Sequence, residues 1–122
     1  MAPNRVGTGS ISELARRGVL VSLGHSEAGY EEARAAVRAG ARAFTHLFNA
    51  MSASIGREPG MVGAALDLAD AFVGIIADGH HVHDANLRVA FAAKRRDRFM
   101  LLPMQCHQQP ADPISSVCRA AA

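Results

Sequence analysis

Segments with helical patterning alternate with short, wholly apolar segments along this 122-residue chain, and the alternation restricts the folds open to it. We expect four helices, at Ile11–Arg17, Glu27–Ala39, Met61–Ala69 and Asp84 to about Arg95, the last with Asp84 as its N-cap. We expect four buried strands, at Val19–Leu23, Ala41–Thr45, Phe72–Ile76 and Arg98–Leu102. Because these strands are apolar throughout, the pattern predicts a parallel sheet whose crossover helices cover it.

Four such units are half of an eight-stranded barrel, which needs about 250 residues. The predicted fold class is therefore α/β: a partial (β/α)8 TIM-type barrel of about four consecutive αβ units, with its domain at residues 1–102. A four-stranded open sheet is the alternative, although its apolar edge strands would be exposed.

Composition excludes several classes of protein. A net charge of +2, spread over many segments, argues against a nucleic-acid partner. No apolar run lies in residues 1–10, and none approaches the roughly 20 residues of a membrane span, so we expect neither a secretory signal nor a membrane partner. The expected location is cytoplasmic.

Composition changes at residues 103–122, which hold both cysteines, all three glutamines and three of the five prolines. Nothing in this stretch has helical or strand periodicity, so we expect an irregular tail. Two cysteines without Cys-x-x-Cys spacing predict neither a disulfide framework nor a metal site.

Two histidines follow neighbouring predicted strands. His25 comes after Val19–Leu23 and His46 after Ala41–Thr45, 21 residues later. The carboxyl ends of adjacent parallel strands share one edge, so the two imidazoles can converge there on a zinc or iron ion. A lone histidine at a strand end is more often an ordinary polar loop residue. A catalytic metal usually needs a third protein ligand, and the sequence offers no obvious one.

Two loops carry further candidates. Arg57 lies in a loop entering a helix, where a guanidinium can bind phosphate or carboxylate bidentately, although a single arginine is usually a surface residue. Asp78 is followed by His80, His81 and His83. Consecutive residues of an extended loop point in different directions, so we assign a function to His81 and treat the other two histidines as bystanders.

Four motifs in series resemble one family. They are Gly24-His25-Ser26, Thr45-His46-Leu47-Phe48-Asn49-Ala50-Met51, Arg57-Glu58-Pro59-Gly60 and Ile76-Ala77-Asp78-Gly79-His80-His81-Val82. In order and spacing they are similar to the N-acetylglucosamine-6-phosphate deacetylases of the amidohydrolase superfamily, which have a barrel fold. The similarity runs to about Leu102 and corresponds to a third or less of a family member.

The resemblance implies a role for each matching residue. His25 and His46 match ligands of a catalytic divalent metal, which polarises the substrate acetamide and activates water. Asn49 and Ala50 match a substrate-contacting pair. Arg57 and His81 match residues that bind the sugar phosphate, in the family across a homodimer interface. The implied reaction releases glucosamine 6-phosphate and acetate.

The chain also departs from the family. The family's third ligand, a glutamate in a His-Leu-Glu-Gly-Pro segment, has no counterpart here, and Asn4 stands where a glutamate is usual. The catalytic aspartate of a Thr-Asp-Ala-Met motif is missing after Leu102. Back-translation of residues 103–108, read one base earlier, can encode Thr-Asp-Ala-Met-Ser-Ser. A frame shift is therefore our hypothesis for the aberrant tail, and it makes the chain an internal fragment of the family sequence.

Three functions remain open at this point. The first hypothesis is that the chain is a deacetylase fragment without activity of its own. It lacks one metal ligand and the catalytic base, and a positioned base alone is typically worth about 10²–10⁴-fold in rate. Alternatively it is a non-catalytic fragment that binds sugar phosphate or pairs with a full-length barrel. A third hypothesis is a dihydroorotase-like amidohydrolase completed by another chain. Arg57 and His81 argue against it, because they favour a phosphosugar over a pyrimidine as the substrate.

Overall fold

The computed structural model describes residues 1–103. Except for Pro103, the predicted tail, with both cysteines, lies outside the described residues. The helices are α1 (Thr8–Arg16), α2 (Tyr30–Arg38), α3 (Gly60–Asp67) and α4 (Asp84–Ala93), followed by a short 3₁₀ helix, η1 (Arg96–Arg98). The strands are β1 (Ser22–Leu23), β2 (Ala43–Phe44), β3 (Phe72–Ile75) and β4 (Phe99–Leu101). The predicted alternation is confirmed. None of the helices in this range is long and apolar enough to cross a membrane.

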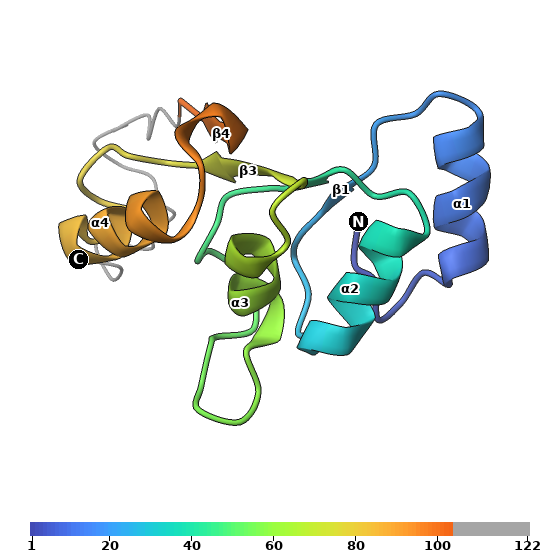
Figure 1. Cartoon of the computed structure of the whole chain (residues 1–122), viewed down its shortest axis with the longest axis horizontal. Coiled ribbons are helices and arrows are strands. Elements are labelled where there is room, and N and C mark those ends of the chain that lie inside the picture. The colour runs from blue at the N-terminus through green and yellow to red at the C-terminus, as the bar shows by residue number, and fades with distance from the viewer. Residues whose placement is uncertain (104–122) are drawn as a thin grey trace, which may run out of the picture.

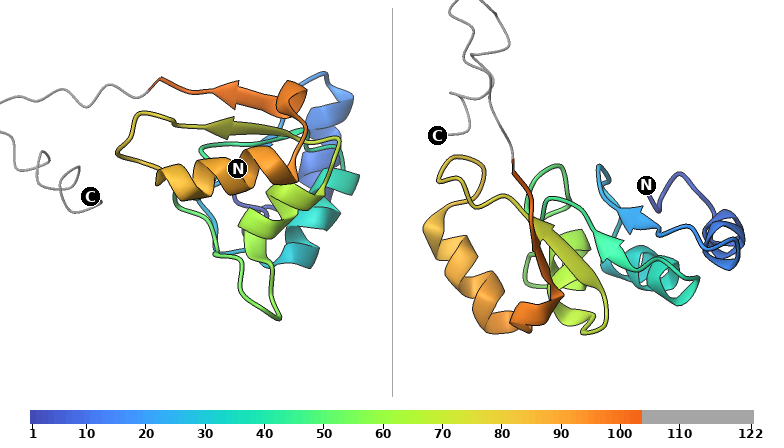
Figure 2. Two further views of the ribbon diagram at one scale, coloured as in Figure 1. Left: turned by 60° about the vertical axis from the view of Figure 1, so that its left-hand side comes forward. Right: turned by 90° about the horizontal axis from the view of Figure 1, so that it is seen from above.

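The strands form one parallel sheet in the order β1-β2-β3-β4, so neighbours in the sheet are also consecutive along the chain. Helices α2, α3 and α4 lie along one side of this sheet, and α1 lies at its β1 end (Figure 1; Figure 2, right). Each crossover between parallel strands passes through a helix, which is the usual form of such a connection. The α/β class with parallel strands is therefore confirmed.

The helix-facing side of the sheet carries the hydrophobic core. Leu23, Phe44 and Val73 lie in register across three strands, and each is fully buried. Ile11 of α1 and Met61 of α3 are also fully buried and belong to the same cluster. Burying a side chain of this size stabilises by about 1.5–3 kcal/mol, so this cluster holds the helices against the sheet.

The strand predicted at Val19–Leu23 is shorter than expected. Only Ser22 and Leu23 pair as β1, while Val19 and Leu20 are 48% and 68% exposed. Their apolar side chains suggested burial, but β1 lies at the edge of the sheet. The opposite edge strand, β4, likewise leaves Leu101 70% exposed.

The start of α2 and the cap of α4 also differ from the prediction. Helix α2 begins at Tyr30 instead of Glu27. The predicted N-cap of α4, Asp84, is wrong: Asp84 is already helical, and His83 is the N-cap, with its Nδ1 accepting the amide of Ala85 at 3.1 Å. The predicted start of α2 is thus three residues too early, and the predicted cap of α4 is one residue too late.

Lys94 ties the end of α4 to the segment after α3. This residue is only 5% exposed, and its Nζ donates to the carbonyl oxygen of Leu68 at 2.8 Å. Burial lowers the pKa of Lys94, because the charged ammonium is partly removed from water. The same carbonyl oxygen, directly after α3, also accepts the amide of Ala71 at 3.1 Å.

Gly60 tests the packing at the start of α3. A Cβ atom here would lie 2.6 Å from the carbonyl oxygen of Ala53 and 2.8 Å from that of Ser52, and the residue has a φ of +60°. Overpacking and left-handed strain add, so we expect Gly60→Ala to lower the free energy of unfolding by about 2–4 kcal/mol. Urea unfolding followed by circular dichroism measures this.

Gly56→Ala is the matched control, since a Cβ at Gly56 would meet nothing within 4 Å. We expect its free energy of unfolding to stay within about 0.5 kcal/mol of the parent chain. Equal unfolding midpoints for the two variants would contradict the packing described at Gly60.

Candidate metal centre

His25 and His46 occupy equivalent positions, each two residues beyond the last residue of its strand. Strands β1 and β2 are parallel neighbours with Leu23 opposite Phe44, so the two histidines leave the sheet at the same level. Their Nε2 atoms are 2.6 Å apart, and their rings meet edge to face with centroids 4.4 Å apart. The structure thus brings the two histidines together, while their role as metal ligands stays a prediction.

The backbone of the two histidine loops is left-handed at four residues that are not glycine. Their φ angles are +51° at His25, +36° at His46, +75° at Phe48 and +47° at Ala50. Such conformations cost about 1–3 kcal/mol each, persist only where the surroundings impose them, and are concentrated at functional sites. Leu47 supplies part of that restraint: its side chain is fully buried and its amide donates to the carbonyl oxygen of β3 residue Gly74 at 2.8 Å.

Gly24 provides the room for the side chain of Thr45, the residue directly before the second histidine. A Cβ atom at this position would stand 2.3 Å from Cγ2 of Thr45 and 3.7 Å from Cε1 of His46. Thr45 therefore packs directly over the Gly24 backbone. A side chain at residue 24 would push Thr45, and with it the adjacent His46, away from the first loop.

The pair fits part of a metal centre. Two ligand nitrogens about 2.0–2.1 Å from a tetrahedral zinc stand about 3.3 Å apart, so the rings of His25 and His46 must separate slightly from 2.6 Å to share an ion. Among residues 1–103, no three side chains of the ligating types come together as a possible metal site. The described chain therefore offers two candidate ligands, one fewer than a catalytic zinc usually takes from protein.

Asn49 and Ala50, the predicted substrate contacts, belong to the same loop as His46. The amide of Asn49 donates to the carbonyl oxygen of His46 at 2.9 Å, and its side-chain Nδ2 donates to that of Leu47 at 3.3 Å. Both residues are therefore held beside the histidine pair by the fold of their own loop.

Arg57 lies in a turn closed by reciprocal backbone hydrogen bonds between Ile55 and Glu58, at 2.9 and 3.1 Å. The loop that carries this turn projects from the body of the molecule beyond α3 (Figure 1). The Arg57 side chain is exposed. The structure does not bring it into contact with the histidine pair within residues 1–103.

Glu58, which the sequence analysis did not single out, anchors the base of that turn. Its Oε1 accepts the amide of Tyr30 at 2.7 Å and the amide of Gly60 at 2.9 Å, the first residues of α2 and α3. The bond from Tyr30, and then that from Gly60, lowers the pKa of Glu58. A glutamate directly before Pro-Gly at a predicted helix start was the available signal, since carboxylates favour helix N-termini.

Asp78 organises the loop that contains His81. Its Oδ1 accepts the amides of His80 and His81 at 2.9 and 3.0 Å, and its Oδ2 is 2.7 Å from Nδ1 of His81. These hydrogen bonds hold the pKa of Asp78 well below its usual range, and the bond from the amide of His81 contributes most, before that from His80. The contact engages Nδ1 of His81, so Nε2 is the nitrogen left to meet a ligand.

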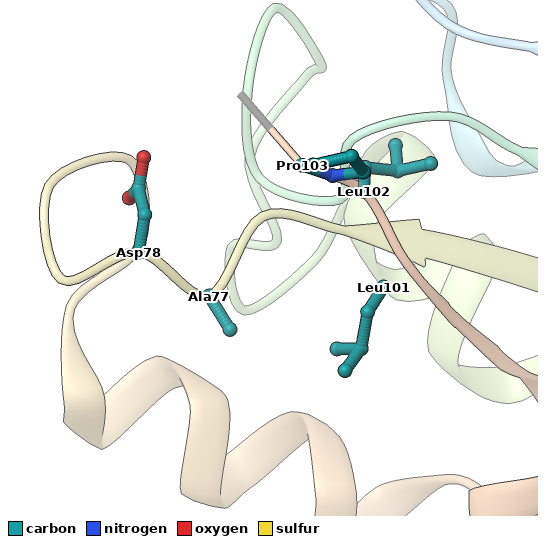
Figure 3. Close-up of a pocket in the computed structure, with 5 residues that line it drawn as sticks. All are labelled: Ala77, Asp78, Leu101, Leu102 and Pro103. Atoms are coloured by element: carbon teal, nitrogen blue, oxygen red, sulfur yellow. The ribbon is translucent and has the colours of Figure 1, made fainter. Parts of the chain in front are cut away.

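A hollow of about 300 Å³ opens between the carboxyl ends of β3 and β4 (Figure 3). Ala77 and Asp78 line it from the β3 side, and Leu101, Leu102 and Pro103 line it from the β4 side. Among residues 1–103, Asp78 is the one charged residue that lines it, and the paired histidines do not line it. The hollow is therefore an apolar space separate from the two imidazoles.

Comparison with known proteins identifies relatives over most of this chain. No family model matches it. An N-acetylgalactosamine-6-phosphate deacetylase from Shewanella sp. (strain ANA-3) is 46% identical over 102 residues, which are 84% of this chain and 26% of the relative. An N-acetylglucosamine-6-phosphate deacetylase from Vibrio furnissii is 46% identical over 91 residues, 74% of this chain and 23% of the relative.

The solved structures that are similar to this chain are also named as deacetylases of this kind. The N-acetylglucosamine-6-phosphate deacetylase of Pasteurella multocida superposes with a TM-score of 0.78 at 42% identity, over 84% of this chain and 27% of the other. The enzyme of that name from Mycobacterium smegmatis also gives 0.78, at 40% identity, over 84% and 27%. The chain thus spans about a quarter of the length of these proteins.

The contact between Gly24 and Thr45 can be tested with a double-mutant cycle. We expect Gly24→Ala to lower the free energy of unfolding by about 1–3 kcal/mol, because its Cβ collides with Cγ2 of Thr45. Thr45→Ser removes that methyl group, so the double variant should recover most of the loss. Strictly additive effects in urea unfolding would show that the two residues do not meet.

The pKa of Glu58 makes a prediction about acid stability. Its folded pKa lies below the ordinary value of about 4.3, so its contribution to stability is present above that value and is lost as the pH falls through the folded pKa. We expect the parent chain to lose stability from about pH 5 to pH 3, and Glu58→Gln to lose less over that range. Thermal melts at several pH values measure the difference.

Glu27→Gln is the control for this pH series, because Glu27 is an exposed glutamate in the turn before α2. Its melts should follow those of the parent chain at every pH. If Glu58→Gln did so as well, the two amide bonds to Glu58 would carry no net stabilisation.

Proposed function

Since the chain is a partial member of the N-acetylglucosamine-6-phosphate deacetylase family, we propose that His25 and His46 are two ligands of a divalent metal, zinc or iron, in an amide-hydrolysing centre. The observation that carries the proposal is the facing pair of Nε2 atoms, 2.6 Å apart on loops of strained backbone. Neutral imidazole is a good ligand for either ion. The bound ion would supply Lewis-acid polarisation of the acetamide carbonyl.

The other matching residues would bind and orient the substrate. Asn49 and Ala50 lie on the loop that His46 begins, so a substrate amide bound at the proposed metal would lie beside them. His81 is oriented through Nδ1 by Asp78 and has Nε2 available for a phosphate oxygen. The exposed guanidinium of Arg57 can bind phosphate bidentately, and its projecting turn is suited to reach a second subunit in a homodimer.

The substrate we propose is an N-acetylhexosamine 6-phosphate, which would be cleaved to the amino sugar phosphate and acetate. The relatives are named for both the gluco and the galacto sugar, at the same 46% identity. N-acetylglucosamine 6-phosphate remains our first candidate, because the relative from Vibrio furnissii and the superposed structures from Pasteurella multocida and Mycobacterium smegmatis are all named for that sugar.

We expect the chain alone to be inactive or nearly so. It lacks a third close ligand among residues 1–103. The predicted catalytic aspartate is also missing directly after Leu102, where the sequence reads Pro103-Met104-Gln105. We propose that it retains the binding of a metal and of a phosphosugar. Pairing with a complete barrel is the second candidate function, favoured by the exposed Leu101 on edge strand β4.

A cobalt(II) titration of the full chain tests the proposed ligands. We expect one cobalt ion per chain at pH 7.5, monitored by its visible absorption, and binding weakened at least about tenfold by His25→Gln or His46→Gln. Binding should also weaken as the pH falls, because protonated imidazole cannot coordinate a metal. The chain should release no acetate from N-acetylglucosamine 6-phosphate above a metal-only blank.

His80→Gln is the matched control for these substitutions, because it removes an exposed histidine that we place outside the centre. It should bind cobalt like the parent chain. If His80→Gln weakened binding as much as His25→Gln, adventitious coordination by surface histidines would replace the proposed centre.

A further inference from the structure

We propose that Ser26 is a positioning residue that pins the loop after β2 to the segment after β1, and so holds the imidazoles of His25 and His46 facing each other. Its bearing on metal binding rests on the function proposed above. Ser26 is one of the few polar residues in the interior of the described chain, with only 6% of its surface exposed.

The backbone of Ser26 closes the loop that His46 begins. The β1–β2 ladder ends where the amide of Thr45 donates to the carbonyl oxygen of Leu23 at 2.8 Å. Pairing resumes at Ser26, which is bridged in parallel to Met51. On the first strand only Gly24 and His25 separate these two attachment points, whereas on the second strand residues 46–50 bulge out between them. Both histidines therefore belong to one ring of backbone, which these two attachment points close.

The bridge consists of two hydrogen bonds. The amide of Ser26 donates to the carbonyl oxygen of Ala50 at 3.1 Å, and the amide of Ser52 donates to the carbonyl oxygen of Ser26 at 3.2 Å. These distances are at the long end for amide–carbonyl bonds. A bridge of this kind needs support from elsewhere to hold a loop whose backbone is left-handed at Phe48 and Ala50.

The hydroxyl of Ser26 provides that support. Its Oγ donates to Oδ1 of Asn4 at 2.7 Å and accepts the amide of Ala28 at 3.1 Å. One hydroxyl thus fixes Ser26 both to the N-terminal segment and to the turn before α2. The bond from the Ala28 amide is buried, so removing the hydroxyl leaves that amide without its partner.

A second serine continues the connection toward α3. Ser52 Oγ donates to the carbonyl oxygen of Ala28 at 2.5 Å and accepts the amide of Met61 at 2.8 Å. The bridge at residues 26 and 51 is therefore connected to the first turn of a buried helix. Ser26 lies where the segments after β1 and β2 and the N-terminal segment meet, which is why we assign it the positioning role.

Ser26→Ala tests the proposal first in the metal-free chain. We expect amide hydrogen exchange at residues 26, 28 and 52 to accelerate at least about tenfold, and nuclear Overhauser contacts between the His25 and His46 rings to weaken. Where the parent chain binds cobalt(II), the variant should bind it about ten-fold to a hundred-fold more weakly, as removal of a group that orients a ligand does. Unchanged exchange and ring contacts would overturn the positioning role, whatever the metal titration gives.

Two further substitutions keep the result interpretable if Ser26→Ala fails to fold. Asn4→Leu removes the acceptor from an exposed position and should reproduce the faster exchange, whereas Asn4→Asp keeps an oxygen acceptor and should restore protection. Ser12→Ala is the matched control, because it deletes the hydrogen bond that the hydroxyl of Ser12, on α1, donates to the carbonyl oxygen of Ala39 at the end of α2. It should move none of these readouts, and equal effects from Ser12→Ala would reduce Ser26 to a general stabilising residue.

The two proposals fail separately. A parent chain that binds no cobalt, with ring contacts still dependent on Ser26, contradicts the metal centre and leaves the positioning role standing. A chain that binds cobalt through His25 and His46 with the same affinity in Ser26→Ala contradicts the positioning role alone.

Discussion

The parallel pairing of β1 with β2 is the interaction on which the rest of the structure depends. It sets Leu23 level with Phe44, and from that register follow both the buried row across the sheet and the meeting of His25 and His46 two residues later. A slip of one residue would turn the side chains of a strand to the opposite face, and it would separate the imidazoles and open the core together. Core and site are therefore fixed by the same few hydrogen bonds.

Beyond the strands, the loops are held by side-chain groups that take up backbone amides. Glu58 accepts amides from the first residues of two helices, Asp78 accepts two amides in its own loop, and Ser26 accepts one beside the histidine pair. Each acceptor lies next to, or within a few residues of, a predicted ligand-binding residue. The loops at this end of the sheet thus gain order from groups that need not touch a substrate.

Much of the fold and part of the site could be predicted from the sequence. Wholly apolar strands separated by helical segments predicted the parallel sheet, and strand-end placement predicted that His25 and His46 would meet. What could not be predicted depends on neighbours distant in the chain. Val19 and Leu20 look buried until the strand order places β1 at an edge. The double capping by Glu58 depends on α2, 28 residues away, and no local pattern encodes it. Whether His83 or Asp84 caps α4 depends on where the backbone changes from extended to helical, and this change comes directly after His83.

The strand order also bears on how the chain acquires its structure. Paired residues in adjacent strands are separated by only 21, 29 and 26 positions along the chain, as in Ser22 with Ala43, Ala43 with Phe72, and Val73 with Phe99. Each pairing therefore closes a short loop, and none must wait for residues far downstream. A ribosome releasing this polypeptide would expose the first two strands, and the imidazoles they present, well before β4 is synthesised. The strand pairing that brings the histidines to one level can thus form before β4, whereas the bond from Leu47 to Gly74 that restrains their loop requires β3.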